Sequence, residues 1–506
     1  MTRTTVAAID LGAESGRVAT VGFDGTRLHL DIAHRFAHSP VVEDGVLRWD
    51  LHTLWAEIQA GLRLLDAGDR PIASLGVDAW GVDYGLLDSH GRLVDAPTCY
   101  RDPRNVRAMK HTIDTVGAET LYDATGVQLI AINTIFSLVA DLRERPGRLA
   151  SAAKLLMMPD VFHHLLSGSS ATEYTAASTS GLFDMQSGRW SEDLLERLGL
   201  SFDLMPEVLP PGTDVGPILG QYTGSLRDSR VILPAAHDTA SAVVGAPLSD
   251  PTAMFISSGT WSLAGVETAN AVVTEKSRRA NLTNEGGYDG TIRLLRNVMG
   301  LWILQNCRRQ WASEGLNLTY AEIAELAERE PGLESAINPD DEDFLAPGDM
   351  PRRIQDYCQR MGMPVPRKVG AIARCVIDSL ALSYRGVAEA VTEVTGIRPG
   401  AINIVGGGSS HSLLSQLTAD ATGLPVRCGP VEATALGNAA VQLAALGELH
   451  GLADIRKVIA ASADLVEYQP RDRHDWDSAA VRFAGLGGDH LAGPDPANRS
   501  SDTHDT

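Results

Sequence analysis

The sequence predicts an α/β protein built from two related domains that face each other. At 506 residues, the chain is too long for one ordinary hydrophobic core. Short apolar runs that end in glycine-rich turns alternate with longer stretches of helical periodicity, which is typical of alternating strands and helices. One strand–turn–strand unit also recurs, because Gly12 and Gly259 lie 247 residues apart, close to half the chain. We therefore expect an N-terminal domain over residues 1–246, a C-terminal domain over residues 247–486, and a disordered tail, rich in Gly, Pro, Ser, Asp and Asn, over residues 487–506.

The first half predicts a hairpin, a helix, two further strands and a short helix. Apolar runs that meet a glycine-bounded turn indicate strands, and apolar residues spaced three or four apart indicate helices. In chain order the segments are a strand over Val6–Ile9, a turn over residues 10–17, a strand over Val18–Phe23, a helix over Leu54–Leu65, strands over Ile72–Asp78 and Val231–Asp238, and a helix over Thr239–Ala246.

The second half predicts the same kinds of element. Its segments are a strand over Ala253–Ile256, a turn over residues 257–262, a helix that includes Asn297 and runs to about Trp311, a helix over Ile372–Thr395, a strand over Ala401–Val405 that ends at glycines 406–408, and helices over Ser412–Gly423 and Ala433–Leu446.

Composition excludes several classes of protein. There are 43 basic and 64 acidic residues, a net charge of −21, whereas a general nucleic-acid binder carries a basic face. Five scattered cysteines without a Cys-x-x-Cys pair predict reduced thiols and no cysteine-ligated metal, and Cys358 and Cys375 are the one pair to inspect for a bridge. The first 30 residues hold no apolar secretory core, and no apolar stretch approaches the roughly 18–20 residues of a membrane span. We expect a cytoplasmic protein, monomer or homodimer, that binds neither nucleic acid nor membrane.

Three glycine-rich turns, each at the end of an expected strand, are candidates for a phosphate site: residues 10–17, 257–262 and 406–408. Such turns expose consecutive backbone N–H groups, which can hold phosphate oxygens without a lysine. The P-loop, Gly-x-Gly-x-x-Gly and Gly-x-Ser-x-Gly motifs are absent from the sequence, which disfavours P-loop NTPases, dinucleotide enzymes and serine hydrolases. Because the chain carries a charge of −21, local N–H donors and a bound Mg²⁺ must attract ATP. The alternative is that all three turns are ordinary tight hairpins.

Charged residues frame the first turn. Asp10, at the end of the first strand, could orient water on Mg²⁺ or merely cap the turn. Ser15 and Arg17 supply donors that could face a transferred phosphoryl group, and the alternative is a solvated turn.

Asp238 is the candidate general base. A carboxylate at the C-terminal end of an apolar strand is held at the mouth of the cleft in which open α/β sheets bind ligands. Attack of a sugar hydroxyl on a γ-phosphate needs an acceptor for the hydroxyl proton, and a nearby carboxylate provides one. The alternative is that Asp238 only caps the following helix, since Asp is a favoured N-cap. Beside it, His237 and Thr239 would donate to sugar oxygens, or else satisfy local backbone groups.

Two side-chain amides form a further candidate contact. Asn297 and Gln305 lie eight residues apart on the expected helix, about 80° from each other around its axis, so they share a broad face. Amides on such a face could contact adenine or ribose, and the alternative is a set of hydrogen bonds in a seam between domains.

Taken together, eight motifs resemble those of the FGGY carbohydrate kinases, within the actin-like and hexokinase-like ATPase superfamily. The resemblance covers about residues 6–445. The motifs are Ala8–Arg17 (AIDLGAESGR), Asp78–Gly85 (DAWGVDYG), Tyr100–Arg104 (YRDPR), His237–Ala242 (HDTASA), Ile256–Ser262 (ISSGTWS), Asn281–Gly287 (NLTNEGG), Asn297–Trp302 (NVMGLW), and Val405–Gly408 (VGGG) with Gly429–Ala433 (GPVEA). The resemblance implies two ribonuclease-H-like domains around a central cleft, with ATP and Mg²⁺ held mainly against the second domain.

Within the family the motifs are most similar to those of the L-rhamnulose kinases. This implies transfer of the γ-phosphate of ATP to O1 of L-rhamnulose, giving L-rhamnulose 1-phosphate in L-rhamnose degradation, with Asp238 as the proton acceptor. The ATP contacts implied by the resemblance are Ala13, Glu14, Ser15, Gly16, Arg17, Thr260, Asn297, Gln305 and Gly407. The implied sugar contacts are Gly81, His237, Asp238 and Thr239.

Two departures from the family pattern bear on these expectations. Glu14 stands where relatives usually carry a small hydroxyl residue, and we expect its side chain to point to solvent while its N–H serves the phosphate. The loop Ser178–Leu182 also differs, which bears on sugar specificity. The alternatives are a kinase for another ketose, such as L-fuculose or L-ribulose, an actin-like ATPase that binds a protein, and a sugar sensor without turnover.

Overall fold

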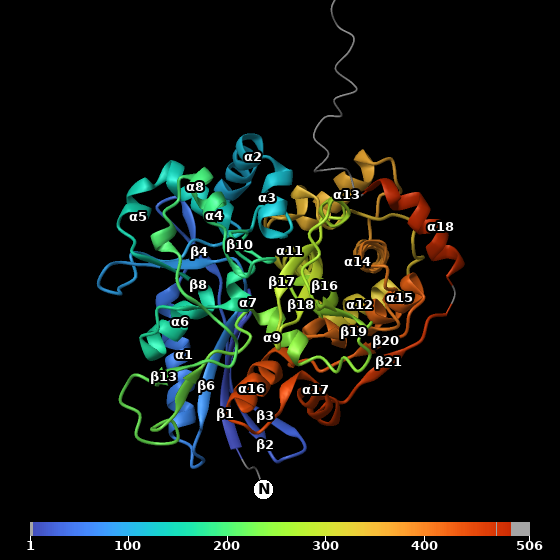
Figure 1. Ribbon diagram of the computed structural model, residues 1–506. Coiled ribbons are helices and arrows are strands. Elements are labelled where there is room, and N and C mark those ends of the chain that lie inside the picture. The colour runs from blue at the N-terminus through green and yellow to red at the C-terminus, as the bar shows by residue number, and fades with distance from the viewer. Residues whose placement is uncertain (1–3, 472, 487–506) are drawn as a thin grey trace, which may run out of the picture.

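Two mixed β-sheets form the centre of the molecule. The computed structural model describes residues 4–471 and 473–486, and the tail expected over residues 487–506 lies outside the described residues. Figure 1 shows the first sheet in the blue-to-green half of the chain and the second in the yellow-to-red half. The first sheet consists, from edge to edge, of β13 (Asp214–Pro217), β14 (Arg230–Ile232), β6 (Ser74–Ala79), β1 (Thr4–Leu11), β2 (Ser15–Phe23) and β3 (Leu28–Ala37). The second consists of β17 (Thr283–Gly286), β18 (Ile292–Met299), β16 (Trp261–Thr268), β15 (Met254–Ser258), β19 (Ile402–Val405), β20 (Val426–Cys428) and β21 (Val466–Tyr468).

Five neighbouring strands of each sheet correspond to one another. β1 pairs antiparallel with β2 and parallel with β6, just as β15 pairs antiparallel with β16 and parallel with β19. Outside these, β3 and β18 add antiparallel partners, and β14 and β20 add parallel ones. The duplication predicted from Gly12 and Gly259 is therefore confirmed, as is the α/β class with two ribonuclease-H-like sheets. The exact domain boundaries remain a prediction.

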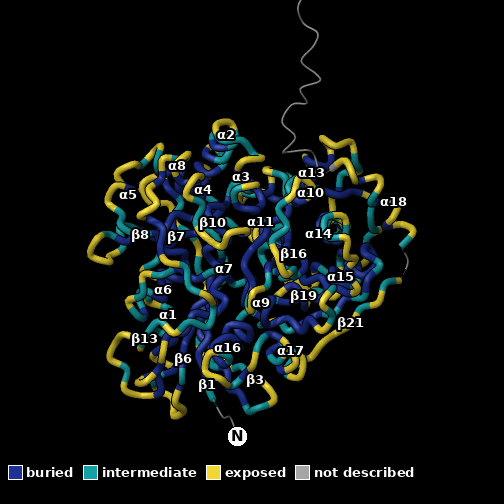
Figure 2. The backbone as a smooth tube through the Cα atoms, viewed as in Figure 1, coloured by how far each residue is buried: buried dark blue, intermediate teal, exposed yellow. Residues whose placement is uncertain are grey.

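Helices bury both faces of the first sheet. Ala7 and Ile9 of β1 pack with α1 (Leu51–Asp66), whereas Val6 packs with α16 (Ala433–Ala445). A strand covered on both faces reads as an unbroken apolar run, which is why the Val6–Ile9 segment shows no alternation. Figure 2 shows the consequence: the central strands are buried, and the exposed segments lie at the periphery. Because α16 comes from the C-terminal end of the chain, the last part of the sequence returns to cover the first sheet.

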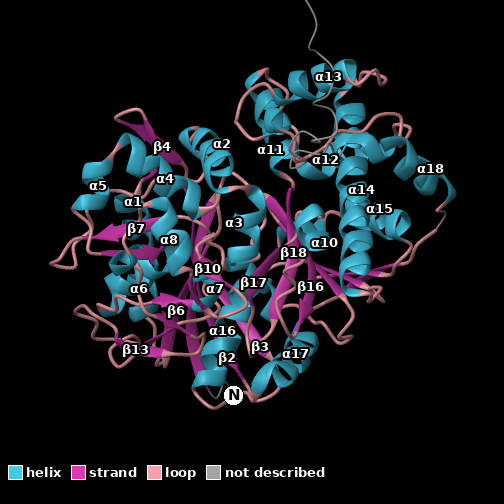
Figure 3. Cartoon of the chain, turned by 45° about the horizontal axis from the view of Figure 1, so that its top comes forward, coloured by secondary structure: helices cyan, strands magenta, loops and turns pink. Residues whose placement is uncertain are grey.

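The second sheet is covered mainly by long helices. Met254 and Ile256 of β15 belong to a large apolar cluster with α11 (Trp302–Ser313), α14 (Val369–Thr395) and α15 (Ser412–Thr422). Figure 3 shows the helices outside the strands in both halves. The further helices are α2 (Arg104–Val116), α3 (Ala118–Thr125), α4 (Thr134–Glu144), α5 (Pro146–Ala150), α6 (Met158–Ser167), α7 (Tyr174–Ala177), α8 (Glu192–Leu198), α10 (Glu275–Arg279), α12 (Tyr320–Glu328), α13 (Met350–Arg360), α17 (Gly451–Ser462) and α18 (His474–Phe483). The further strands are β4 (Pro40–Glu43), β5 (Val46–Trp49), β7 (Tyr84–Leu87), β8 (Lys154–Met157), β9 (Thr172–Glu173), β10 (Phe183–Asp184), β11 (Arg189–Trp190) and β12 (Val208–Leu209).

A glycine pair sets the position of α9 (Asp238–Val244), the helix that carries Asp238. A methyl group on Gly437 of α16 would lie 1.8 Å from the carbonyl oxygen of Ser241, and one on Gly245 would lie 2.0 Å from that of Ala433. These glycines allow the backbones of α9 and α16 to touch, so the end of α9 is fixed against a helix that also packs on β1 and β6.

Two local predictions are wrong. The strand expected over Val231–Asp238 ends at Ile232, and Asp238 begins a helix instead, because Pro234 has no N–H to continue the ladder. The helix expected to include Asn297 begins only at Trp302, and Asn297 lies on β18.

The five cysteines are all free thiols, so Cys358 and Cys375 do not form a bridge. Within residues 4–471 and 473–486, no helix is both long and apolar enough to cross a membrane.

Candidate active site

The three glycine-rich turns and Asp238 open onto one cavity of about 300 Å³ between the two sheets. With one exception, the residues predicted for the site line it: Asp10, Ala13, Glu14, Ser15, Arg17, Gly81, His237, Asp238, Thr239, Thr260, Asn297, Gln305 and Gly407. The exception is Gly16, which is buried under the ring of Phe36, where an added methyl group would lie 2.3 Å from a ring carbon. Packing against Phe36 therefore requires glycine at position 16, and this residue is not part of the cavity lining.

Opposite charges meet at the first turn. Asp10 of β1 and Arg17 of β2 are register partners, and Arg17 Nη2 lies 2.6 Å from Asp10 Oδ2. Asp78 of β6 lies beside Asp10 in the parallel register, and its Oδ2 accepts a hydrogen bond of 2.6 Å from Asn438 Nδ2. Burial raises the pKa of Asp10 to about 6, against the opposing charge of Arg17. Burial, with the charge of Asp10, also raises the pKa of Asp78 well above its usual value.

The second and third turns carry few charges and pack against each other. A methyl group on Gly408 would lie 2.0 Å from Ser258 Oγ, and Gly406 adopts a φ of 80°, which favours glycine. A methyl group on Gly407 would meet nothing within 4 Å, so its backbone is open to a ligand. The carbonyl of Thr260 accepts the N–H of Trp302 at 3.1 Å, which joins the second turn to the start of α11.

Asp238 lies at the first turn of α9 and is not its N-cap, which is His237. Its Oδ1 accepts the Thr239 N–H at 2.5 Å, and its side chain is 26% exposed, into the cavity. Burial raises the pKa of Asp238 above its ordinary value, although His237 and Thr239 oppose the shift. A carboxylate with a raised pKa is a stronger base than a surface Asp, and the position therefore suits proton abstraction.

His237 sits between Asp238 and a buried ion pair. Its Nε2 lies 3.4 Å from Asp238 Oδ1, and a methyl group on Gly81 would lie 3.1 Å from Nε2. Its Nδ1 lies 3.2 Å from Glu285 Oε2 on β17 and 3.2 Å from Arg293 Nη2 on β18. The ring thus connects the two sheets across the cavity.

The two predicted amides belong to different elements. Asn297 lies on β18, where its N–H donates at 2.9 Å and its Nδ2 at 3.1 Å to Gln128 Oε1 of the first half. Gln305 lies on α11 and lines the cavity near Thr260. They do not share a helix face, because the chain changes from strand to helix after Gly300.

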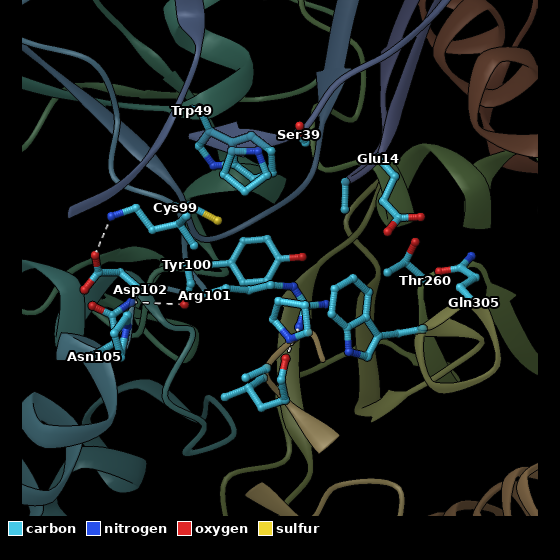
Figure 4. A pocket seen from close by; sticks show the side chains of 18 of the residues that line it. Glu14, Ser39, Trp49, Cys99, Tyr100, Arg101, Asp102, Asn105, Thr260 and Gln305 are labelled. Atoms are coloured by element: carbon cyan, nitrogen blue, oxygen red, sulfur yellow. Dashed lines mark hydrogen bonds between the residues drawn. The ribbon is translucent and has the colours of Figure 1, made fainter. Parts of the chain in front are cut away.

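The Glu14 side chain crosses the cleft and does not point freely to solvent. Its Oε1 accepts a hydrogen bond from Arg309 Nη2 of α11, with side-chain exposures of 34% and 52%. Both residues also line a larger cavity of about 790 Å³ that adjoins the first. Figure 4 shows Glu14, Thr260 and Gln305 grouped at one end of this cavity, with Tyr100 between them and Asp102. The expectation that the Glu14 side chain points to solvent is wrong, because it pairs with a cation on the opposite wall, and the role of its N–H stays a prediction.

Comparison with known proteins decides the family. The chain matches the N-terminal domain of the FGGY carbohydrate kinases over residues 5–245 and their C-terminal domain over residues 254–446. The chain belongs to the FGGY family of carbohydrate kinases. A rhamnulokinase of Bacteroides thetaiotaomicron is 39% identical over 479 residues, 94% of this chain and 98% of the relative. A rhamnulokinase of Pectobacterium carotovorum is 40% identical over 483 residues, 95% of this chain and 96% of the relative.

Solved structures show the same kinase fold at low sequence identity. A gluconate kinase from Lactobacillus acidophilus gives a TM-score of 0.78 at 17% identity, covering 96% of this chain and 99% of that one. A ligand-bound xylulose kinase from the same species gives a TM-score of 0.76 at 18% identity, covering 96% of both chains. A Plasmodium falciparum glycerol kinase with ADP gives 0.74 at 14% identity, covering 95% and 97%. These structures share the two-domain fold, and membership of the FGGY family, not the structural likeness, implies a sugar and ATP as substrates.

Three polar residues of this carbohydrate kinase that lie at the site were not predicted from the sequence. Gln128, Glu285 and Arg293 are buried around His237 and Asn297. One signal was present: Arg293 interrupts the apolar run Ile292–Leu295, and a charge inside a buried strand needs a partner. Gln128 offered no local signal, since its partner lies 169 residues away.

The carboxylates of the cavity suit a hard cation that shares its ligands with phosphate. The charge of Asp238 raises the pKa of Asp10, the charges of Asp10 and Asp238 raise that of Asp78, and Asp78 Oδ1 is buried without a hydrogen-bond partner in the described chain. Among the described residues, no group of three or more His, Cys, Asp or Glu could hold a metal ion alone. Asp10 and Asp238, both on the cavity wall, fit Mg²⁺, which is usually held by one or two carboxylates together with water and phosphate oxygens.

Proposed function

We propose that the protein is an ATP-dependent kinase that phosphorylates L-rhamnulose at O1, giving L-rhamnulose 1-phosphate in L-rhamnose degradation. The observation that carries the proposal is the position of Asp238, a carboxylate with a raised pKa in the same cavity as the three phosphate turns. The rhamnulokinase relatives, which match nearly the whole chain at 39–40% identity, support the choice of ketose.

Asp238 acts as the proton acceptor in this mechanism. Its carboxylate takes the proton of the ketose O1 hydroxyl while O1 forms a bond to the γ-phosphorus of ATP. The bond between that phosphorus and the β,γ-bridging oxygen breaks, and ADP leaves with the electron pair. Positioning and charge neutralisation contribute most of the rate, and the base contributes roughly 10²- to 10⁴-fold.

Backbone and cationic donors hold the nucleotide. The N–H groups of the turns at Ala13–Ser15, Thr260 and Gly407 face the polyphosphate, and Arg17 balances the charge of the transferred group. Gln305, on α11 near Thr260, contacts the nucleoside. Asp10, with Asp238 nearby, would hold Mg²⁺, which when bound would supply positive charge to the phosphate oxygens.

The ketose occupies the side of the cavity around His237. Gly81, His237 and Thr239 contact the sugar, and Gly81 leaves room for it because any side chain there would meet His237 and Thr179. We assign Asn297 to this side as well, since its side chain hydrogen-bonds Gln128 and also hydrogen-bonds Glu285 beside His237, which lowers the pKa of Glu285. Thr179, from the Ser178–Leu182 loop, is held in this wall because its Oγ1 accepts a hydrogen bond of 3.0 Å from the Val82 N–H.

A coupled ADP-release assay with Mg²⁺ and a panel of L-rhamnulose, L-fuculose and L-ribulose tests the proposal. We expect the highest kcat/KM with L-rhamnulose and a phosphorus-coupled carbon resonance at C1 of the product. A clear preference for another ketose would reject L-rhamnulose, and ATP hydrolysis unaffected by every sugar would favour an actin-like ATPase. A cytoplasmic location, where ATP is supplied and the five free thiols stay reduced, is part of the proposal.

A further inference from the structure

Glu285 and Arg293 form a buried ion pair that takes no direct part in the proposed chemistry. Arg293 is 0% exposed, and in the antiparallel register of β17 and β18 it lies opposite Glu285, with Nη1 3.2 Å from Oε2. Taking such ions out of water costs several kcal/mol each, and an apolar pair of similar volume is often as stable. Stability alone therefore does not explain why the second sheet buries these two charges.

Both members of the pair contact His237 of the first half. Arg293 Nη2 and Glu285 Oε2 each lie 3.2 Å from its Nδ1, while its Nε2 faces Asp238 and Gly81 in the cavity. The backbone N–H of His237 donates to Thr175 Oγ1 at 3.1 Å, which fixes the start of α9. One ring nitrogen thus faces the ion pair and the other faces the proposed ketose site.

The hydrogen bonds favour one tautomer of the ring. A guanidinium can only donate, so the bond from Arg293 Nη2 requires an unprotonated Nδ1, and the neutral ring then carries its proton on Nε2. Glu285 Oε2 also lies 3.2 Å from Nδ1, but Arg293 Nη1 lies 3.2 Å from the same oxygen and balances its charge, which leaves Nδ1 to accept the hydrogen bond from Nη2. Burial raises the pKa of Glu285, but the charge of Arg293 outweighs this and leaves it below the ordinary value. Glu285 is therefore ionised and balances the charge of Arg293.

We propose that Arg293 is a positioning residue for phosphoryl transfer: it holds His237 in the Nε2–H tautomer, with that N–H directed at an oxygen of the ketose beside Asp238. The proposal rests on the proposed function for the identity of the sugar. Because Arg293 belongs to the second sheet and His237 to the first half, the ketose site is complete only when the two halves are docked.

Kinetics of Arg293→Gln test the positioning role. We expect kcat/KM for the ketose to fall about 10- to 100-fold, the range of a hydrogen bond to a charged group, while KM for ATP changes less than about threefold. Arg374→Gln is the matched control, since Arg374 lies 2.8 Å from the buried Asp378 on α14, lines neither of the two cavities described above, and should lower stability without moving either constant. Ketose kinetics like those of the parent would overturn the proposal, as would an equal change in both KM values.

A double variant separates positioning from folding. Arg293→Met with Glu285→Met removes both charges and keeps an apolar core, so we expect it to fold with a melting temperature near that of the parent. It should nevertheless show the same ketose defect as Arg293→Gln. A folded double variant with parental ketose kinetics would overturn the proposal even if the single variant is unstable.

Nitrogen NMR of the full-length protein with ¹⁵N-histidine tests the tautomer without any sugar. We expect the His237 resonances, assigned by their loss in His237→Gln, to show a protonated Nε2 in the parent and to lose that fixed pattern in Arg293→Gln. A protonated Nδ1 in the parent would overturn the proposal. If the parent phosphorylates no ketose, the proposed function fails while this measurement still decides the role of Arg293.

Discussion

The first and second phosphate turns differ in chemistry although equivalent strands form them. At the first, Asp10 of β1 lies opposite Arg17 of β2. At the second, Ser257 of β15 lies opposite Leu263 of β16. The neighbouring parallel strands extend the contrast, since Asp78 lies beside Asp10.

At the second turn, the corresponding neighbour on β19 is the apolar Val405. The duplicated unit therefore has a glycine-rich turn in both halves, but paired charges only at the first turn. A carboxylate in each turn would repel the same polyphosphate, whereas hydroxyl and N–H groups bind it without a like charge. This comparison predicts that variants of Asp238 and Arg17 in the first half affect the chemical step, and that variants of the second turn affect nucleotide binding.

The largest expected effect is that of Asp238→Asn. Without a proton acceptor, kcat should fall by roughly 10²- to 10⁴-fold, while the affinity for ATP stays within a few-fold because the turns are intact. Single-turnover rates and ATP titration calorimetry measure the two quantities. Asp378→Asn, a buried carboxylate of α14, is the control. A rate within tenfold of the parent would remove Asp238 from the mechanism.

Arg17→Met should give the next largest effect, because it removes the cation next to the transferred group and leaves Asp10 unpaired. We expect kcat to fall roughly 10- to 100-fold. Arg35→Met is a matched control, since Arg35 contacts Glu432, as Arg17 does, but is 47% exposed.

Thr260→Val in the second turn should raise KM for ATP and change kcat less than about fivefold. A larger loss of kcat in Thr260→Val than in Arg17→Met would reverse the comparison.

The pH profile should show the acid limb of Asp238. Only the ionised carboxylate accepts a proton, and its folded-state pKa is raised above 3.8, so the active form is lost at a higher pH than for an exposed Asp. Below that pKa, kcat/KM should fall about tenfold per pH unit. A limb that persists in the residual activity of Asp238→Asn belongs to another group, and Asp10, with a pKa of about 6, is the first to test.

Local features of the sequence predicted the fold and the turns well. Apolar runs and glycines that follow one another along the chain sufficed for the duplicated hairpins. Prediction failed where the decisive partner is distant or where the local pattern is ambiguous. Pro234 ends β14 early, and the apolar spacing around Asn297 fits a helix as well as the strand that β16 selects by pairing along it. The contact of Arg293 with His237 spans 56 residues and depends on how the two sheets dock, which no local pattern records.

The smallest expected effect concerns the ion pair between Glu14 and Arg309 across the cleft, and variants of its two members should change KM for ATP in opposite directions. Glu14 places a carboxylate beside the first turn, and Arg309 of α11 neutralises it. Glu14→Ser should therefore lower KM for ATP a few-fold, whereas Arg309→Gln should raise it a few-fold by leaving the carboxylate unpaired beside phosphate. Each should change the free energy of unfolding by less than about 1 kcal/mol, because both side chains are partly exposed. Both shifts should shrink at high salt, which screens exposed charges. Steady-state KM for ATP at low and high salt checks the signs, and shifts in the same direction would mean that the pair holds the cleft together without acting on phosphate.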